Sequence, residues 1–503
     1  VDLSNLNNIE SISDELLIKD NHQLANIDGL SNLRYVGDLN IFRNTMLVNL
    51  NGFLGLETIG NEMVIRGNDN LISTTGLNNL TSVGWGMTIS LNKRLKDVDG
   101  FSSLLFNIER ISLSDNDSLT NVDGFFSPNP SQIDDLEIKN CSLLINVDGF
   151  SALDSIHGAI DIINCNALTN VDGFSNLRYL FRGMDIWYND ALQDIDGFSN
   201  ITHYGGAYGG AVHIRDNPSL LDVNGLIGLT TGSRMELWNN DALMDLDGLS
   251  NLTYLNNVLY IRNNNSLQHI NGLSKLTRVG NIAGGERSLT ISENANLKNI
   301  DGLAGLDSML SVMPLTIMGN ESLENINGLL SIRRIGNLRI NDNDAIQNLD
   351  GLMNLTGAGL IAINDNDRLT NIDGMSNLTD VTSIIGIQSN AMLTNVNGLS
   401  ALQNFRELRI HNNDMLVDLS GISQLDTVDG VLRISDNDAL LDLLDLRNLK
   451  RVEEDLEILD NDGLTTLAGL DQVNFAGSLY VTDNDNLQNL DGLNNLDTVN
   501  GKI

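Results

Sequence analysis

The sequence is short of several residue types, and each shortage argues against a class of protein. Four prolines and two cysteines in 503 residues leave no material for a proline-rich linker or a disulfide scaffold. Only 29 lysines and arginines stand against 66 aspartates and glutamates, so the net charge is −37 and the pI is near 4.2. Because phosphate binding needs clustered Lys and Arg, this balance argues against nucleic acid and anionic membranes as partners. No apolar run approaches the roughly 18 residues of a membrane-spanning helix, so we expect no membrane insertion.

What the sequence has in abundance is repetition. A pattern of an aliphatic residue, Asp or Asn, Gly, and Leu or Phe first occurs at 27–30 and recurs, mostly every 23 or 24 residues, until 490–493. A period of about 20–50 residues is typical of a solenoid, in which each coil contacts only its neighbours and one core extends without a domain break. We therefore predict one continuous solenoid of about twenty coils over residues 1–503. Local insertions are expected near 203–211, 282–288 and 306–314.

Each repeat begins with a short strand and continues through two turns. In Ile111-Ser112-Leu113-Ser114-Asp115-Asn116 apolar and polar residues alternate with the period of two that indicates a half-buried strand. Helical periodicity is absent, so we expect an all-β chain whose short strands stack into parallel sheets. Gly occupies its column in nineteen of twenty repeats, and Asp445 replaces it once. We interpret this column as a left-handed backbone position, which Gly adopts freely and Asp tolerates.

A second column, after the strand, is asparagine in eighteen of twenty repeats. An inward Asn at this place can hydrogen-bond the turn backbone of its own and the neighbouring coil. The two exceptions are Cys141 and Cys165 in adjacent repeats, between Asn116 and Asn189. Their Cα atoms can fall within disulfide distance, but in-register parallel side chains make the torsion unfavourable. We favour two reduced thiols that take the place of Asn in a ladder.

These residues carry a resemblance to a known family. A strand of the form L-x-L-x-x-N, with Cys as the substitute for Asn, resembles the leucine-rich repeat. The L-x-x-I-x-G-L step that follows is similar to the repeat of receptor L domains. The resemblance implies a parallel β-solenoid, or β-helix, that forms a single continuous rod. Receptor L domains have few coils and cysteine-rich neighbours, whereas this chain has about twenty coils and two cysteines, so growth-factor receptor function does not transfer.

The strongest candidate site is a group of aromatic and basic residues at outward strand positions. Two of the three tryptophans fall in it, next to glycine-rich insertions. Exposed aromatics with Arg are typical of binding hot spots and also suit sugar rings; the alternative is that aromatics simply favour exposed strand positions. The candidate ligand-binding residues are Trp187, Tyr188, His213, Arg215, Trp238, Tyr260 and Arg262.

Acidic residues on both sides of the Asn column form a second candidate. Stacks of carboxylate oxygens can hold Ca²⁺, the one cofactor that we consider. Turn chemistry is the reading that we favour, because Asp and Asn stabilise turns through their own side chains. The candidate ligands in three consecutive coils are Asp436, Asp438, Asp460, Asp462, Asp483 and Asp485.

We predict a non-enzymatic repeat scaffold, because no Ser/His/Asp grouping, metal-ligand cluster or phosphate-binding loop occurs. The expected location is extracellular or on the cell surface, and the expected role is structural or adhesive, as a stalk, fibre or filament subunit. The alternative is an ectodomain that binds a glycan or a protein through the aromatic and arginine face. The sequence begins within a repeat at Leu3 and ends within another at Ile503. A second copy joined head to tail through these half-coils is therefore one expected partner, and other surface proteins or glycans are the others.

Overall fold

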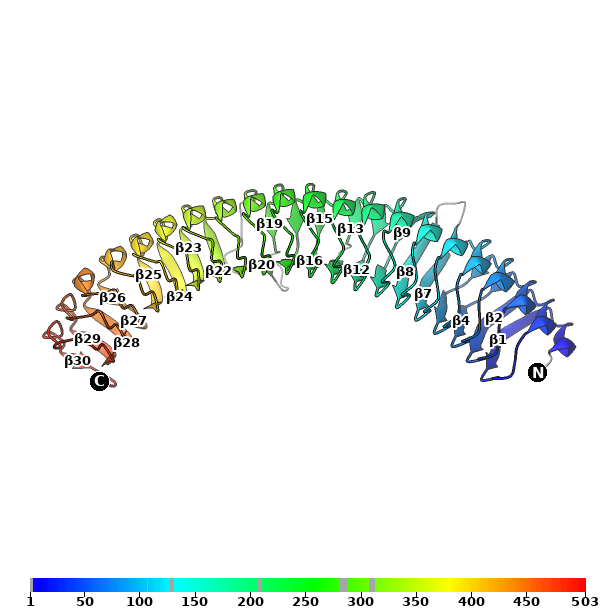
Figure 1. Cartoon of the computed structure of the whole chain (residues 1–503), viewed down its shortest axis with the longest axis horizontal. Coiled ribbons are helices and arrows are strands. Elements are labelled where there is room, and N and C mark those ends of the chain that lie inside the picture. The colour runs from blue at the N-terminus through cyan, green and yellow to red at the C-terminus, as the bar shows by residue number, and fades with distance from the viewer. Residues whose placement is uncertain (1–2, 106, 127–130, 206–209, 281–286, 307–312) are drawn as a thin grey trace. The chain divides into compact units, whose positions relative to one another are not determined.

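The computed structural model describes residues 3–105, 107–126, 131–205, 210–280, 287–306 and 313–503. The chain divides into two compact units, Val1–Leu252 and Thr253–Ile503. Each unit is a stack of similar coils in which parallel strands alternate with three-residue 3₁₀ helices (Figure 1). The prediction of a parallel β-solenoid is confirmed, and that of a single continuous rod stays a prediction. The expected insertions fall largely on residues outside the described ranges.

The strands of the first unit are β1 (Ser11–Lys19), β2 (Tyr35–Phe42), β3 (Thr58–Ile59), β4 (Glu62–Arg66), β5 (Ser82–Val83), β6 (Gly86–Ser90), β7 (Asn107–Ser114), β8 (Ser131–Lys139), β9 (Leu153–Ile156), β10 (Ala159–Ile163), β11 (Tyr179–Leu180), β12 (Gly183–Trp187), β13 (His203–Tyr204), β14 (Ala211–Arg215), β15 (Thr231–Gly232) and β16 (Arg234–Trp238). Its 3₁₀ helices are η1 (Ser4–Leu6), η2 (Asp28–Leu30), η3 (Asn51–Phe53), η4 (Thr75–Leu77), η5 (Asp99–Phe101), η6 (Asp123–Phe125), η7 (Asp148–Phe150), η8 (Asp172–Phe174), η9 (Asp196–Phe198), η10 (Asn224–Leu226) and η11 (Asp247–Leu249).

The strands of the second unit are β17 (Tyr254–Leu255), β18 (Val258–Arg262), β19 (Arg278–Val279), β20 (Ser288–Ser292), β21 (Leu315–Met318), β22 (Arg334–Asn341), β23 (Gly357–Asn364), β24 (Asp380–Gln388), β25 (Asn404–His411), β26 (Thr427–Val428), β27 (Leu432–Ser435), β28 (Arg451–Leu459), β29 (Phe475–Thr482) and β30 (Thr498–Val499). Its 3₁₀ helices are η12 (Asn271–Leu273), η13 (Asp301–Leu303), η14 (Asn327–Leu329), η15 (Asp350–Leu352), η16 (Asp373–Met375), η17 (Asn397–Leu399), η18 (Ser420–Ile422) and η19 (Leu444–Leu446).

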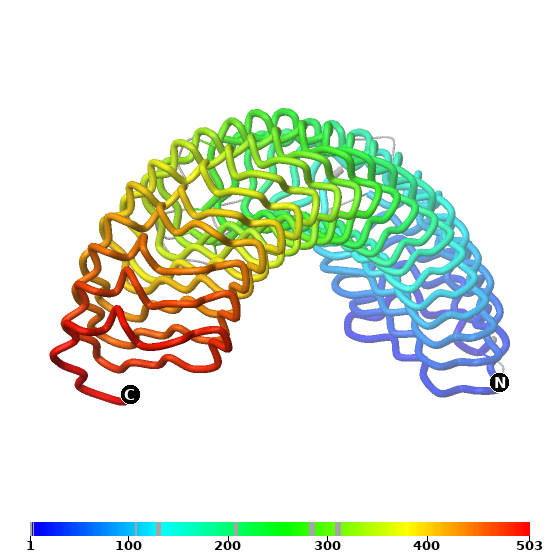
Figure 2. Tube along the Cα trace, turned by 60° about the vertical axis from the view of Figure 1, so that its left-hand side comes forward, coloured from blue at the N-terminus to red at the C-terminus, as the bar shows by residue number. Residues whose placement is uncertain are grey.

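Successive coils pair their strands in parallel, so residues one repeat apart become side-by-side neighbours. In the first unit Ile160 pairs with Met184, and Met184 pairs with Val212. The second unit repeats the arrangement from β20 to β25. Figure 2 shows the coils of each unit as successive turns of the chain. Because the register is constant, each position of the repeat becomes a column of stacked side chains.

The left-handed backbone position lies at the end of the strand, immediately before the Asn column. All twenty coils have a positive φ there, for example 56° at Asp115 and 70° at Gly67. The next residue then enters the core. Asn92 is fully buried; its side-chain nitrogen donates to the carbonyl of Ile65 at 2.9 Å, and its oxygen accepts the backbone N–H of Asn68 at 3.0 Å. Each Asn therefore satisfies backbone groups of neighbouring coils, which would otherwise be buried without partners.

Seventeen of the nineteen column glycines, all of which the structure describes, lie in the 3₁₀ helices and have no positive φ, so our left-handed interpretation is wrong for them. The other two, Gly469 and Gly492, lie outside these helices and have a positive φ of 109° and 112°. The reason for Gly is close approach of two backbones. A Cβ atom on Gly149 would lie 1.8 Å from the carbonyl oxygen of Val122 in the previous coil, and a real Cβ contact is never below 3.0 Å.

Asp445 is the one residue in this column that is not Gly, and its side chain bonds the backbone of the previous coil. Its carboxylate accepts a hydrogen bond from the N–H of Leu419 in the previous coil, at 3.0 Å. Burial raises the pKa of Asp445, and the hydrogen bond from Leu419 opposes that rise. The column therefore tolerates a side chain where that side chain bonds the neighbouring coil.

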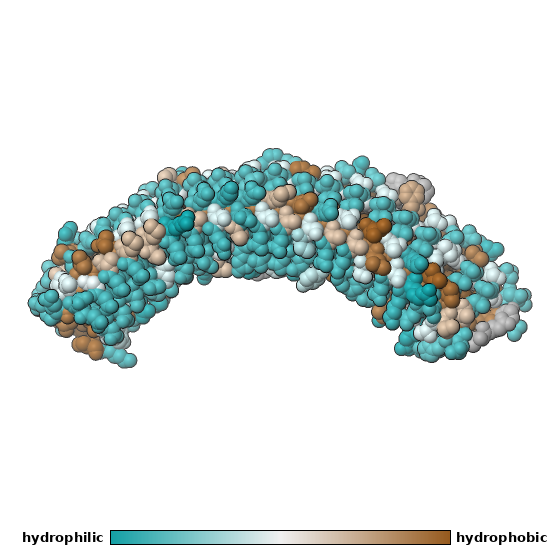
Figure 3. All heavy atoms as spheres, viewed as in Figure 1, coloured by the Kyte–Doolittle hydropathy of each residue, from teal (hydrophilic) through white to brown (hydrophobic). Residues whose placement is uncertain are grey.

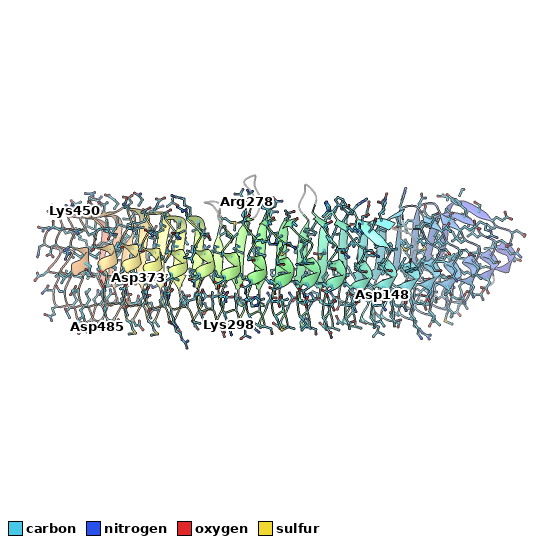
Figure 4. The ribbon with its side chains drawn as sticks, turned by 90° about the horizontal axis from the view of Figure 1, so that it is seen from above. Asp148, Arg278, Lys298, Asp373, Lys450 and Asp485 are labelled. Atoms are coloured by element: carbon cyan, nitrogen blue, oxygen red, sulfur yellow. The ribbon has the colours of Figure 1, made fainter. Side chains whose placement is uncertain are left out.

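The row of 3₁₀ helices gives a frame for locating surface residues (Figure 4). In the second unit Asp373 lies on this row, Arg278 and Lys450 lie along one edge, and Lys298 and Asp485 lie along the other. The latter edge is formed by the turns that follow the Asn column. In the part of the chain that the structure describes, no helix is long and apolar enough to cross a membrane. The face seen in Figure 3 is mostly hydrophilic, with apolar atoms in small patches.

Candidate binding site

Three of the candidate residues form one cluster on the strand face of the first unit. Trp187, Arg215 and Trp238 end the adjacent strands β12, β14 and β16 and are paired in register. The guanidinium carbon of Arg215 lies 3.5 Å from the centre of the Trp187 ring and 5.4 Å from that of Trp238. Arg215 is thus held between two indole faces, where cation–π attraction contributes about 0.5–2 kcal/mol. We call Trp187, Arg215 and Trp238 the aromatic–arginine cluster.

The alternation of the strand places the cluster where a partner can reach it. Ile186, Ile214 and Leu237 precede the cluster residues and are fully buried, so the cluster side chains lie on the opposite face of the sheet. All three cluster residues are half-buried rather than fully exposed. Two side-chain donors, Nε1 of Trp187 and Nε of Arg215, are buried with no hydrogen-bond partner among the described residues. An acceptor supplied by a bound partner would satisfy such donors once the side chains adjust.

Tyr188 extends the cluster and has an unusual backbone. Its ring stacks on that of Trp187 with centroids 6.0 Å apart, and it is 53% exposed. It occupies the left-handed column with a φ of 57°. This conformation disfavours bulky side chains, and strain of this kind gathers at binding sites.

A charged row lies beside the cluster, two residues earlier in the same strands. His213 lies between Asp185 and Glu236, with Nδ1 2.6 Å from Asp185 and Nε2 3.8 Å from Glu236. The Glu236 side chain is 3% exposed and also pairs with Arg234. His213 is therefore held by carboxylates on both sides instead of projecting freely as part of an aromatic face.

Tyr260 and Arg262 belong to the second unit, on β18. Tyr260 pairs in register with Thr290, and Arg262 pairs with Ser292. The Nε atom of Arg262 donates to the Ser292 hydroxyl at 3.2 Å. Of the seven predicted residues, the structure thus groups five in the first unit and places two in the second unit.

The predicted Ca²⁺ ligands lie on the two sides of the Asn column in three consecutive coils of the second unit. Asp436, Asp460 and Asp483 occupy the left-handed column, which favours Asp for backbone reasons. Desolvation raises the pKa of Asp460, and the carboxylates of the neighbouring aspartates raise it further. Within the described ranges, no three His, Cys, Asp or Glu side chains are arranged to hold a metal ion. The remaining predicted ligands, in the turns after the Asn column, are Asp438, Asp462 and Asp485.

The two cysteines replace Asn chemically as well as in position. Both are free and buried. The thiol of Cys141 lies 3.8 Å from the carbonyl of Leu113, the position that an Asn amide would bond, and its sulfur accepts the backbone N–H of Asn116. Cys165 is still bonded to the next member of the ladder, because its backbone N–H donates to the side-chain oxygen of Asn189 at 2.9 Å. Burial raises the pKa of the Cys165 thiol to about 12 and that of Cys141 further, so both thiols stay protonated.

Sequence reasoning missed a second surface feature of the first unit, a groove over its early coils. Residues from the ends of β1, β2 and β4 and from the following turns line it. The available signal was a column in which Lys19, Phe42 and Arg66 are register neighbours. Taken one at a time in the sequence, these three residues show no sign of a common site.

The coil geometry defines a solenoid of the leucine-rich-repeat type, with a parallel strand, an Asn ladder and a short return helix in each repeat. No protein-family model matches the sequence, and no curated protein matches it.

The solved structures that are similar to the chain include the following three. An internalin from Listeria monocytogenes is 18% identical, covering 78% of this chain and 84% of its own, with a TM-score of 0.33. A leucine-rich-repeat protein from Leptospira interrogans is 14% identical, covering 93% and 95%, with a TM-score of 0.31. A plant peptide hormone receptor in complex with its peptide is 14% identical, covering 94% and 92%, with a TM-score of 0.24. The class assignment rests on the coil geometry of the chain itself.

Proposed function

We propose that the chain is a non-enzymatic, extracellular adhesive scaffold that holds a protein partner on the aromatic–arginine cluster. The observation that supports this most is the placement of Arg215 between two tryptophan rings on three consecutive strands. Trp, Tyr and Arg are the residues that most often dominate the free energy of protein binding. The half-buried rings provide area at low entropic cost, because the neighbouring coils already fix them.

The acidic surface supports a partner that carries basic or aromatic groups around the contact. The net charge of −37 repels acidic partners and accelerates the approach of basic ones. Beside the cluster Asp185 is bonded to His213 and Glu236 is paired with Arg234, so the attraction for a basic partner comes from the charge of the whole chain. A protein partner with an exposed basic rim is therefore the best match.

The experiment measures binding of the whole chain to a panel of purified extracellular proteins and to a glycan panel. Tryptophan fluorescence in a Trp85→Phe background reports on the cluster alone, because the sequence has three tryptophans and two of them are in the cluster. We expect saturable binding of a protein and a loss of at least thirtyfold in affinity for Trp238→Ala. Tyr254→Ala is the control, since Tyr254 is also half-buried under an arginine but lies in the second unit.

Three results would count against the proposal. Protein binding that Trp238→Ala leaves unchanged would move the site elsewhere. Saturable binding of a glycan in place of a protein would favour the glycan-binding alternative. Polymerisation of the pure chain, seen by electron microscopy and sedimentation velocity, would favour a head-to-tail structural subunit. Labelling of intact source cells with an antibody tests the extracellular location independently.

A further inference from the structure

The early coils of the first unit contain a basic groove of about 760 Å³. Its volume is within the range of about 300–1,000 Å³ that ligand sites occupy. It lies where strands end and the turns after the Asn column begin, and it is independent of the aromatic–arginine cluster. The lining residues are Glu15, Leu17, Lys19, His22, Phe42, Arg43, Thr45, Arg66, Gly67, Asp69, Leu91 and Lys93.

The charge of the groove is opposite to that of the chain. Four of its twelve lining residues are Lys or Arg and two are Glu or Asp, an excess of two positive charges in a chain with a net charge of −37. Arg43 pairs with Asp20 at 2.8 Å, and Lys93 pairs with Asp69 at 3.4 Å. Lys19 and Arg66 form no ion pair with any carboxylate of the described residues. These two cations are therefore available to an anionic ligand.

An apolar surface lies between the two available cations. Phe42 is the register neighbour of both Lys19 and Arg66, so a half-buried ring separates the charges by one strand on each side. Leu17 and Leu91 are 49% and 37% exposed. Strand spacing of about 4.8 Å puts Lys19 and Arg66 roughly 10 Å apart. The pattern fits a ligand that has an apolar group with one anionic group on each side of it.

Two of the groove residues, Arg43 and Leu91, have a backbone conformation that is unfavourable for bulky side chains. In sixteen of the twenty coils the left-handed column carries Asp, Asn, Ser or Gly, which tolerate it. The four exceptions are Arg43, Leu91, Tyr188 and Glu293. Two of these four line the groove, and a third, Tyr188, extends the aromatic–arginine cluster. Bulky side chains at a position that costs them about 1–2 kcal/mol suggest a role other than folding.

We propose that this groove binds an extended acidic peptide, with its carboxylates at Lys19 and Arg66 and an apolar side chain on Phe42. The lining spans four coils, about 14 Å, which equals about four residues of extended chain. A small apolar anion would require an enclosed cavity, whereas Leu17 and Leu91 are open to solvent. The available cations give the peptide charge-assisted hydrogen bonds at two points of fixed spacing.

The test uses the whole chain and the fluorescein-labelled peptide Gly-Glu-Gly-Leu-Gly-Glu-Gly, because alternate residues of an extended chain share one face. Its matched probes replace every glutamate by glutamine or by lysine. In low salt we expect the glutamate peptide to bind saturably and the other two to bind at least tenfold more weakly. The double variant Lys19→Ser/Arg66→Ser should lose at least tenfold in affinity for the glutamate peptide. The charge-matched control Arg447→Ser/Lys450→Ser in the second unit should lose less than twofold.

A second variant separates the apolar contact from charge. Phe42→Ser places a residue found at Ser90 in the same column, so the coil should still fold. It should lower the affinity for the glutamate–leucine peptide at least fivefold and change the affinity for an all-glutamate peptide by less than twofold. Equal binding of the glutamate and glutamine peptides, or unchanged binding by the double variant, would overturn the proposal. Tighter binding of a sulfated oligosaccharide or of anionic vesicles would overturn the peptide assignment. Trp238→Ala should not affect peptide binding, so this test and that of the proposed function can fail separately.

Discussion

The central coils of the first unit and the coils of the second unit hold their neighbours together with different columns. In the first unit the residue after Gly is phenylalanine in five successive coils, and the rings stack with centroids 5.2–5.9 Å apart. In the second unit the same column carries Leu, Met or Ile. The stacked rings are Phe101, Phe125, Phe150, Phe174 and Phe198.

The Asn hydrogen-bond ladder, by contrast, is more complete in the second unit than in the first. In the second unit it runs without interruption from Asn264 to Asn484. In the first unit Cys141 and Cys165 interrupt it, within the five coils that have the aromatic stack. A thiol is a weaker donor and acceptor than an amide. The aromatic stack therefore adds about 0.5–1.5 kcal/mol per ring pair where the ladder is weakest.

Breaking the ladder where no aromatic stack supports it should have the largest effect. Asn413 donates to Ile387 at 3.1 Å and accepts the N–H of Asn390 at 3.1 Å. The Asn413→Ala variant leaves both backbone groups buried without these partners, at about 2 kcal/mol each. We expect a loss of about 4 kcal/mol in local stability, measured by hydrogen exchange of the amides in β24, β25 and β27.

The matched control changes the residue immediately before it. Asn412 occupies the left-handed column and is exposed, and eight other coils have Asp at that position. Asn412→Asp should therefore change protection of the same amides by less than about 0.5 kcal/mol. A loss in Asn413→Ala no larger than this would show that the ladder does not hold the coils together.

Removing one ring should have a smaller effect, and one that depends on the cysteines. Phe150 stacks on Phe125 and Phe174, at 5.2 Å and 5.9 Å. We expect Phe150→Leu, which inserts the second unit's residue, to cost about 1.5 kcal/mol in urea unfolding. If the stack compensates for the thiols, the same change should cost less in a Cys141→Asn/Cys165→Asn background. An equal cost in both backgrounds would mean that the two columns act independently.

Much of the fold was predictable because one repeat fixes every coil. The alternation around Ile111 predicts the strand, and the Asn column predicts the ladder that Asn92 and its neighbours form. The role of the column glycine was not predictable from one repeat. A glycine in nearly every repeat fits either a positive φ or a close approach, and only the carbonyl of the neighbouring coil decides between them.

The candidate site was predictable as far as the register of the strands was predictable. Trp187, Arg215 and Trp238 occupy the same place in successive repeats, so their contact follows from parallel stacking. The basic groove was missed because its residues come from one short stretch in each of four successive repeats and form a surface only when the coils stack in register. The bulky Arg43 and Leu91 before the Asn column were the available signal, once that column is known to be left-handed.

The smallest expected effect concerns the acidic row on the 3₁₀ helices, which also differs between the units. In the first unit the residue before Gly is aspartate in five successive coils, whereas in the second unit no more than two aspartates follow each other there, at Asp350 and Asp373. Desolvation, and then nearby carboxylates, raise the pKa values of Asp99, Asp148 and Asp196 above the ordinary 3.8; these carboxylates belong to neighbouring coils, except that Asp97 of the same coil also acts on Asp99. A raised pKa in the folded state means that the native chain binds these protons more tightly than the unfolded chain. This contribution to stability should therefore increase as the pH falls from neutrality through the raised pKa values, and become complete below 3.8.

Asp148→Asn tests this directly, because Asn occupies the same column at Asn224. At pH 7 and low salt we expect the variant to raise Tm by about 1 °C, since the repulsion between exposed carboxylates is weak. The gain should shrink as the pH is lowered towards 4 and as salt is added, because protonation and screening remove the same repulsion. Asp373→Asn is the control: Asp373 lies on the corresponding row of the second unit and has Asn397 on one side (Figure 4). With one carboxylate neighbour in place of two, it should gain about half as much, and an equal gain would mean that the row of five has no collective effect.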